Sequence, residues 1–112
     1  MATDKSPLTV IHAPTAVNEL HDIWRWNAQQ YGVVHADKYL GFLTDAIAKL
    51  ASMHERGRAV PSRPDLRYII VRRRAKGHGH VAVYNYDDRE LHLLHVFHTA
   101  QNWQAQLAEE SG

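Results

Sequence analysis

The stretch Gly79–His98, GHVAVYNYDDRELHLLHVFH, decides how the rest of the chain is organised. Two runs rich in β-branched and aromatic residues flank the short charged sequence DDR at positions 87–89. A tight polar turn between two such runs is typical of a β-hairpin. The sequence that follows His98, TAQNWQAQLAEE, has the composition of a helix, so we predict a helical tail over residues 99–112. The two predicted strands are Val81–Tyr86 and Glu90–Phe97.

Two amphipathic helices precede this hairpin. Apolar residues recur at three- and four-residue steps in Ala16–Tyr31 and again in Ala36–Met53, which is the period of a helix with one apolar face. Thr15 is the predicted N-cap of the first helix, and Gly32 is its predicted stop. Gly57 is the predicted end of the second helix. Two such helices with a short connection form an antiparallel helical hairpin.

The remaining segments complete an α+β fold. We predict strands at Leu8–His12 and Leu66–Val71, because both runs are rich in β-branched residues. The segment Arg56–Asp65 contains two prolines and a glycine and is predicted to be a loop. The expected order is β-α-α-β-β-β-α in one domain over residues 1–112, with the helical hairpin packed on one face of a small antiparallel sheet. Met1–Pro7 is a polar lead-in, and Ala75–His78 is a predicted turn.

The predicted sheet carries apolar residues on both faces. Alternation along the last strand puts Leu91, Leu93 and Phe97 on one face and Leu94 and Val96 on the other. The strand before the hairpin likewise has Tyr68 and Ile70 on one face and Ile69 and Val71 on the other. Two helices cover only one face, so the tail, a second copy or a different chain must cover the other. Leu91, Leu94, His95 and His98 also fit a helical face; the strand is preferred because a turn and a strand of matching length precede it.

Composition excludes several classes of protein. The chain has no cysteine, which excludes disulfides and thiolate chemistry. Its apolar runs are far shorter than a membrane span, and the start MATDKSP lacks the apolar core of a signal peptide. We therefore expect a cytoplasmic protein. The net charge is only +1, but arginines crowd the middle of the sequence, which fits either a basic surface for an acidic partner or a solvated edge.

Several segments, taken in order, resemble the ParE/RelE superfamily of bacterial type II toxins, and its ParE branch most closely. The resemblance covers about residues 8–107. It departs from the family pattern at His95, where arginine is common, and at Met53-His54, which replaces the usual Phe-Pro. The first departure puts in doubt any role that the arginine has in the family. The segments that carry the resemblance are Ala16–Gly32, Ala36–Leu50, Asp65–Arg67, Val83–Tyr86, Leu94–His98 and Asn102-Trp103.

This resemblance implies a growth-inhibiting toxin that is encoded with an antitoxin. In the family the antitoxin's extended C-terminal segment wraps the toxin, which would also explain a sheet with two apolar faces. ParE-like members poison DNA gyrase by binding it. RelE-like members cut mRNA on the ribosome, so a ribosome-dependent endoribonuclease is the alternative function. A third hypothesis is an inactive relative that acts only as a binding partner. We expect no cofactor. We do expect the toxin to form a hetero-oligomer with its antitoxin.

The resemblance also directs attention to candidate site residues. Cleavage of RNA by its 2′-hydroxyl needs an acid, a base and a cation near the phosphate. If the chain is a ribonuclease, Arg67 and Arg73 would supply the positive charge and His98 the acid or base. The alternative for His98 is a structural role, in which it caps its strand and forms local hydrogen bonds. The residues expected to bind a partner are Arg67, Ile69, Val71, Arg73, Leu94, Val96 and Trp26.

The nine histidines do not predict a metal site. His78 and His80 share a face if that segment is extended, and His92 and His98 share a face of the last strand, with His95 pointing to the other side. No spacing among them matches a zinc signature. We therefore expect no metal.

Overall fold

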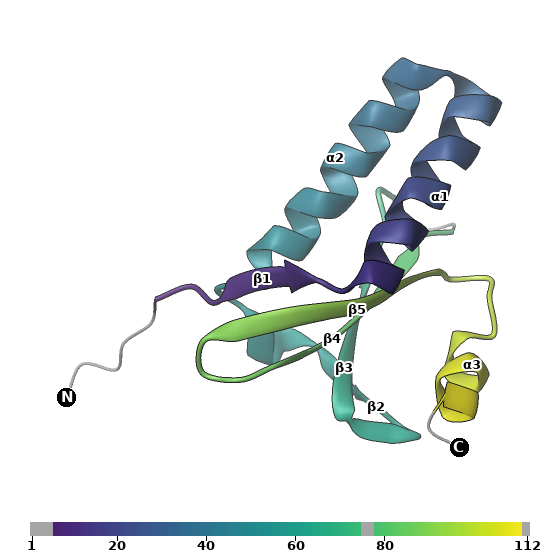
Figure 1. Ribbon diagram of the computed structural model, residues 1–112. Helices are drawn as coiled ribbons and strands as arrows, with labels where there is room; N and C mark the ends of the chain where they lie inside the picture. Colours follow the sequence, from purple (N-terminus) through teal and green to yellow (C-terminus); the bar gives the residue numbers. More distant parts are fainter. Residues whose placement is uncertain (1–5, 75–77, 111–112) are drawn as a thin grey trace.

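The computed structural model describes residues 6–74 and 78–110, in which a helical hairpin stands against a five-stranded sheet (Figure 1). The α+β class and the predicted succession of elements are confirmed, with one additional short strand. No helix among the described residues is long and apolar enough to cross a membrane. The elements are β1 (Thr9–His12), α1 (Pro14–Tyr31), α2 (Val33–Lys49), the 3-10 turn η1 (His54–Arg56), β2 (Arg58–Val60), β3 (Arg63–Val71), β4 (His80–Tyr86), β5 (Glu90–His98) and α3 (Trp103–Glu110).

The sheet is mixed, and not wholly antiparallel as predicted. Its strand order is β1-β5-β4-β3-β2. β1 runs parallel to β5, with Thr9 opposite Glu90 and His12 opposite Leu93, while the other neighbouring strands are antiparallel. Parallel pairing needs a long connection between the two strands, and almost the whole chain separates β1 from β5. The hairpin of β4 and β5 is confirmed and lies at the centre of the sheet.

Both predicted helix boundaries need correction. α1 begins at Pro14, with Ala13 and not Thr15 at the cap, and no side chain caps it. Proline suits the first turn because its missing N–H would have no helical partner there. α2 ends at Lys49, well before Gly57, and a turn and η1 follow it. Gly32, the only described residue with a positive φ, does separate the two helices as predicted.

The predicted loop Arg56–Asp65 contains a strand. β2 pairs with β3 through Arg58 opposite Tyr68 and Ala59 opposite Arg67, and β3 begins at Arg63 instead of Leu66. A strand of three residues next to prolines has too little sequence signal to be recognised. β2 is the outermost strand, the position in a sheet where nearby prolines are tolerated. Most of the predicted turn Ala75–His78 lies outside the described residues, as do the first residues of the lead-in and the last two of the tail.

A bulge in β5 overturns the predicted assignment of faces. Val83 is opposite His95, but the next residue, Tyr84, is opposite Leu93, so Leu94 has no partner on β4. An unpaired extra residue interrupts the alternation of a strand. Leu93 and Val96 consequently pack in the core under the helical hairpin, while Leu94 and Phe97 pack on the other face. The predicted groups, Leu91 and Leu93 with Phe97, and Leu94 with Val96, were wrong for this reason.

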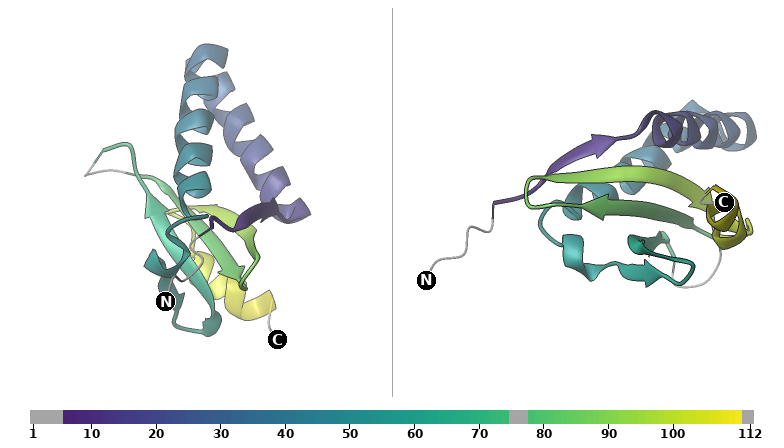
Figure 2. Two further views of the ribbon diagram at one scale, coloured as in Figure 1. Left: turned by 90° about the vertical axis from the view of Figure 1, so that its left-hand side faces the viewer. Right: turned by 60° about the horizontal axis from the view of Figure 1, so that its bottom comes forward.

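Two main hydrophobic cores lie on the two faces of the sheet, and a smaller third cluster of Leu8, Leu50, Tyr84 and Leu91 adjoins the first among the described residues. The first lies under the helical hairpin and joins α1 and α2 to Val71, Ala82, Leu93 and Val96. The second lies under the tail helix α3, whose Trp103 and Leu107 pack on the opposite face. Figure 2 shows α3 well apart from the two long helices. The tail was one of the three possible covers predicted for the second apolar face, and in this structure α3 of the tail does cover it. The sheet residues under α3 are Val60, Leu66, Val81, Val83 and Phe97.

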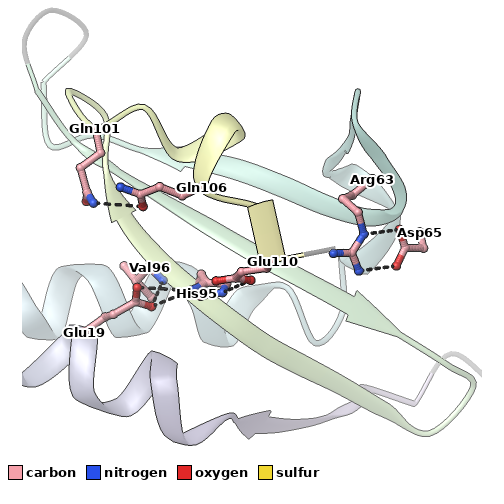
Figure 3. A network of polar contacts seen from close by, with 8 residues as sticks. All are labelled: Glu19, Arg63, Asp65, His95, Val96, Gln101, Gln106 and Glu110. Atoms are coloured by element: carbon pink, nitrogen blue, oxygen red, sulfur yellow. Dashed lines mark hydrogen bonds and ion pairs between the residues drawn. The ribbon is translucent and has the colours of Figure 1, made fainter. Parts of the chain in front are cut away.

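A polar network fastens α3 to α1 across β5 (Figure 3). The His95 ring lies between two carboxylates, with Nδ1 3.2 Å from Glu19 of α1 and Nε2 3.1 Å from Glu110 of α3. Glu19 also accepts a hydrogen bond from the backbone N–H of Val96 at 2.9 Å. These carboxylates raise the pKa of His95, with the hydrogen bond to Glu19 as the largest cause. A protonated His95 therefore links three elements that packing alone would hold separately.

Candidate functional site

Two hollows lie beside the helical hairpin, and the first follows the exposed edge of β3. We call it the edge groove; its volume is about 740 Å³. β2 pairs with β3 only as far as Tyr68, so the outer edge of β3 from Ile69 to Val71 has no strand neighbour among the described residues. Free N–H and C=O groups on such an edge are a ready template for another strand. Apolar side chains from Phe42, Ala46 and Met53 on the α2 side and Ile69 and Ile70 on the β3 side line this groove.

The edge groove is predominantly basic. Asp45 is the one acidic residue that lines it in the described part of the chain. Ile70 and Met53 are unusually exposed for apolar residues, at 46% and 38%. An extended segment that carries apolar and acidic side chains would match both the backbone edge and the charge of this surface. The cationic lining residues are Lys49, Arg56, Arg58 and Arg72.

The second hollow, which we call the histidine pocket, lies between the helical hairpin and the start of β4. Its volume is about 810 Å³, within the range of small-molecule sites. One wall is formed by α1 and α2, and the other by described residues on either side of residues 75–77 and by the end of β5. The side chains that line it include Trp26, Tyr31, Tyr39, Arg73, His80 and His98.

His80 is held in place by Tyr39 within this pocket. The Tyr39 hydroxyl lies 2.6 Å from His80 Nδ1, and His80 is only 8% exposed. Burial, with a smaller contribution from His98, lowers the pKa of His80 to about 4. Burial also raises the pKa of Tyr39, partly opposed by the charge of Arg73. At neutral pH the pair is therefore an uncharged imidazole and an intact phenol.

His98 lies next to His80, which is opposite it in the sheet. The two ring centres are 5.3 Å apart. His98 Nδ1 accepts a hydrogen bond from the backbone N–H of Ala100 at 3.0 Å. Burial and nearby His78 lower the pKa of His98, so it is neutral at pH 7 with its proton on Nε2. The bulge at Leu94 puts His98 on the face opposite to the one predicted from His92, because it reverses the alternation between them.

The three residues proposed for a ribonuclease are not brought together. Arg73 and His98 both line the histidine pocket. Arg67 lies further back along β3, where it donates hydrogen bonds to the backbone carbonyls of Glu55 and Gly57 at 3.0 and 2.8 Å. β3 continues for four residues beyond Arg67 and ends at Val71, a span of about 13 Å, and Arg73 lies beyond that end. In this structure Arg67 supports the turn before β2.

The residues expected to bind a partner also occupy different environments. Ile69 and Val71 line the edge groove, although Val71 is only 5% exposed and belongs to the core under the helices. Val96 is buried in that same core, because the bulge turns it towards the helices. Leu94 packs under α3. Trp26 is 53% exposed and lines the histidine pocket.

Sequence reasoning missed several residues of both hollows. Phe42 and Met53 looked like ordinary members of the apolar face of the second helix. Tyr39 looked the same, and only its hydroxyl indicated that it would need a polar partner. His80 could have been found by pairing it with His98, since both flank the central hairpin. Ile70 was recognised as an apolar residue but was not assigned to a site.

Among the described residues, one set of three has its metal-type ligand atoms within 4.8 Å of one another. It consists of Asp87, Glu90 and His92 at the turn between β4 and β5. Asp87 already accepts hydrogen bonds from the backbone N–H groups of Arg89 and Glu90, both at 2.8 Å, and these bonds lower its pKa. The set is therefore explained as the polar structure of a tight turn.

Comparisons with known proteins agree with this fold. The family model described as ParE toxin of type II toxin-antitoxin system, parDE, matches residues 10–103. A solved structure described as the chromosomal ParDE TA system from P. aeruginosa is similar, with a TM-score of 0.68 and 17% sequence identity. The similarity covers 82% of this chain and 96% of that one. No curated protein matches the sequence.

Proposed function

Because the chain belongs to the ParE toxin family of type II toxin–antitoxin systems, we propose that it is a cytoplasmic growth-inhibiting toxin that a cognate antitoxin neutralises. The observation that carries this proposal is the edge groove, where the outer edge of β3 lies unpaired beside exposed apolar side chains. An antitoxin segment that adds a strand next to Ile69–Val71 would gain backbone hydrogen bonds there. Its apolar side chains would fill the groove beside α2.

Charge supports the same assignment. Four cationic side chains and one carboxylate line the edge groove, so an acidic segment would be attracted to it. Rim charges of this kind mainly affect the rate of association and its dependence on salt. We propose that the antitoxin carries an acidic and apolar C-terminal segment, and that toxin and antitoxin form a hetero-oligomer.

We propose further that the toxic activity is binding and poisoning of DNA gyrase, with no chemical step by the toxin. This follows the ParE family membership, and the separation of Arg67 from His98 favours it over RNA cleavage. A binding toxin needs exposed anchors, and aromatic residues are the usual ones. Trp26 and Tyr31, at 53% and 62% exposure, are such anchors on the helical hairpin.

Two assays with the purified protein test the target. In a supercoiling assay we expect the toxin to inhibit gyrase, and the His98→Ala variant to inhibit it equally. In a cleavage assay on translating ribosomes we expect no cut mRNA. Cleavage that is lost in His98→Ala would establish the ribonuclease alternative and overturn the gyrase proposal.

Growth experiments test the pairing with an antitoxin. Expression of the chain alone should arrest bacterial growth, and co-expression of the antitoxin from the neighbouring reading frame should restore it. If the chain never arrests growth but still binds the antitoxin from the neighbouring reading frame, this would support the third hypothesis, an inactive family member that acts only by binding.

A further inference from the structure

Two of the histidines that line the histidine pocket, His80 and His98, have only the Nδ1 atoms of their rings in hydrogen bonds to other described residues. His98 carries its proton on Nε2, because Nδ1 accepts from Ala100. His80 also carries its proton on Nε2 when Tyr39 donates its hydroxyl proton to Nδ1. His80 Nε2 has no hydrogen-bond partner among the described residues. The one fully buried side-chain nitrogen or oxygen without a partner among these residues is His54 Nδ1, so His80 Nε2 is not fully buried. Solvent therefore reaches it, and the histidine pocket is the hollow that His80 lines.

Positive charge surrounds these donors. Arg73 and Arg74 line the pocket, and Asp22 is the one acidic residue among the described residues that line it. The Arg73 guanidinium lies 5.7 Å from the centre of the Phe42 ring, and it is close enough to Tyr39 to lower that residue's pKa. Guanidinium groups bind phosphate oxygens through paired N–H donors. Two imidazole N–H groups and an arginine at one site are therefore suited to an oxyanion.

The opposite wall is aromatic and open to solvent. Trp26 and Tyr31 line the pocket with more than half of each residue exposed. Their rings are 5.9 Å apart, and the Tyr31 ring is 4.7 Å from the His35 ring. Exposed aromatic rings in a basic cavity are the usual platform on which nucleic-acid bases stack. A ligand that satisfies both walls has a flat aromatic part and a phosphate.

We propose that the histidine pocket binds a nucleoside phosphate, with its base on Trp26 and Tyr31 and its phosphate at Arg73, His80 and His98. The inference goes beyond the proposed gyrase binding, with which it shares Trp26 and Tyr31, and beyond the antitoxin groove, which is lined by other residues. The pocket volume of about 810 Å³ accommodates one nucleotide. The shared chemistry is that of a free nucleotide or of one nucleotide in an RNA strand.

Calorimetric titration of the full chain tests the proposal with adenosine 5′-monophosphate as the probe. Adenosine and inorganic phosphate are titrated separately, because each supplies only one half of the ligand. We expect the monophosphate to bind at least ten times more tightly than either one. Equal affinity for the monophosphate and inorganic phosphate would overturn the proposal, since it would show a general anion site only.

Three exposed substitutions locate the binding without disturbing the core. Arg73→Gln should weaken the binding of the monophosphate about ten-fold and leave the affinity for adenosine unchanged. Trp26→Ala should weaken the binding of the monophosphate and of adenosine but not the binding of inorganic phosphate. Arg89→Gln, at the exposed β4–β5 turn, is the matched control and should change nothing. If Arg73→Gln behaves like Arg89→Gln, the phosphate does not bind in this pocket and the proposal fails.

Two further measurements complete the test. The imidazole NMR signals of His80 and His98 should shift when the monophosphate is added, and unchanged signals would contradict the proposed site. A five-nucleotide single-stranded RNA distinguishes the two sources of the ligand. If it binds more tightly than the monophosphate, the pocket takes a nucleotide within a strand; if it binds equally or less tightly, the pocket takes a free nucleotide.

Discussion

At the residue scale, the Tyr84 hydroxyl organises the turn between α2 and β2. Tyr84 is fully buried, and its hydroxyl donates to the backbone carbonyl of His54 at 2.6 Å and accepts from the backbone N–H of Gly57 at 3.0 Å. A Cβ on residue 57 would collide with the Tyr84 ring. The glycine is thus required by a close approach, and not by the end of a helix as its sequence context predicted.

Replacing Tyr84 with Phe should destabilise the protein. The ring would still fill its space, but the His54 carbonyl and the Gly57 N–H would lose their partner. Leaving buried polar groups unpaired costs about 1–3 kcal/mol, so the free energy of unfolding measured with urea should fall by that amount. Tyr31→Phe, at an exposed position, is the control. Equal unfolding midpoints for the two variants would contradict the expectation.

His95 should make stability depend on pH. Glu19 and Glu110 raise its pKa in the folded protein, so protonated His95 stabilises the fold at acid pH. That stabilisation is lost as the pH rises through the folded pKa. His80 acts oppositely, because its pKa is lowered from 6.5 to about 4 and stability falls as the pH drops through that interval.

Comparison with His95→Gln isolates the first effect. The free energy of unfolding of both proteins should be measured between pH 5.5 and 8.5. We expect the difference in free energy of unfolding between the wild type and His95→Gln to be largest at pH 5.5 and to shrink as the pH rises. Glu110→Gln, which removes the partner on α3, should reduce the same pH dependence in part. An advantage that is constant across this range would show that His95 acts only through packing.

The residues of the candidate sites were only partly visible in the sequence. His98 could be singled out because it ends a strand. Its pairing with His80, and the contact of His80 with Tyr39, depend on how β4 meets α2, which no local pattern encodes. The burial that keeps His80 neutral is likewise a property of the packed structure.

At the element scale, the open edge of β3 gives a direct test of antitoxin docking. Ile70→Glu would put a negative charge in the basic edge groove, where Ile70 is 46% exposed. We expect the dissociation constant for the antitoxin to rise at least ten-fold, with little change in stability. Val34→Glu, at a 70% exposed position on α2 outside the groove, is the matched control. Equal affinities for the two variants would exclude the groove as the docking surface.

The elements themselves show what periodicity can and cannot predict. Helical spacing located α1 and α2 well, because each buries one continuous apolar face. It failed at the end of α2, where Leu50 and Met53 keep the helical spacing after the helix has stopped. Alternation located β5 but not the bulge at Leu94. One extra residue changes the face of everything beyond it, and the amino acids themselves do not reveal where the insertion is.

At the scale of the whole molecule, α3 is required to cover the second face of the sheet. A chain that ends at Gln101 would expose the second core, which holds Phe97 and the apolar residues of β4 on that side. Exposed apolar surface of this kind promotes association. We expect the truncated chain to bind a hydrophobic dye and to elute as a larger species in size-exclusion chromatography.

Glu110→Gln separates this covering role from the ion pair. It removes the negative charge that faces His95 but keeps Trp103 and Leu107 in place, so the variant should remain similar in size to the wild type. If the truncated chain also stays dispersed and binds no dye, α3 is dispensable as a cover. The sequence correctly predicted that something must cover this face. It named the tail as one of three possible covers but did not choose among them, because the tail's short helix has only two deeply buried residues.

The parallel pairing of β1 with β5 sets an order in time for the synthesis of this protein. The first strand has no strand neighbour until β5 has left the ribosome, because β5 is the one strand that pairs with it in the described part of the chain. Contacts between distant parts of a chain also form slowly. The nascent sheet consequently stays incomplete until β5 has been synthesised, and an antitoxin that is already present can meet the chain as it folds.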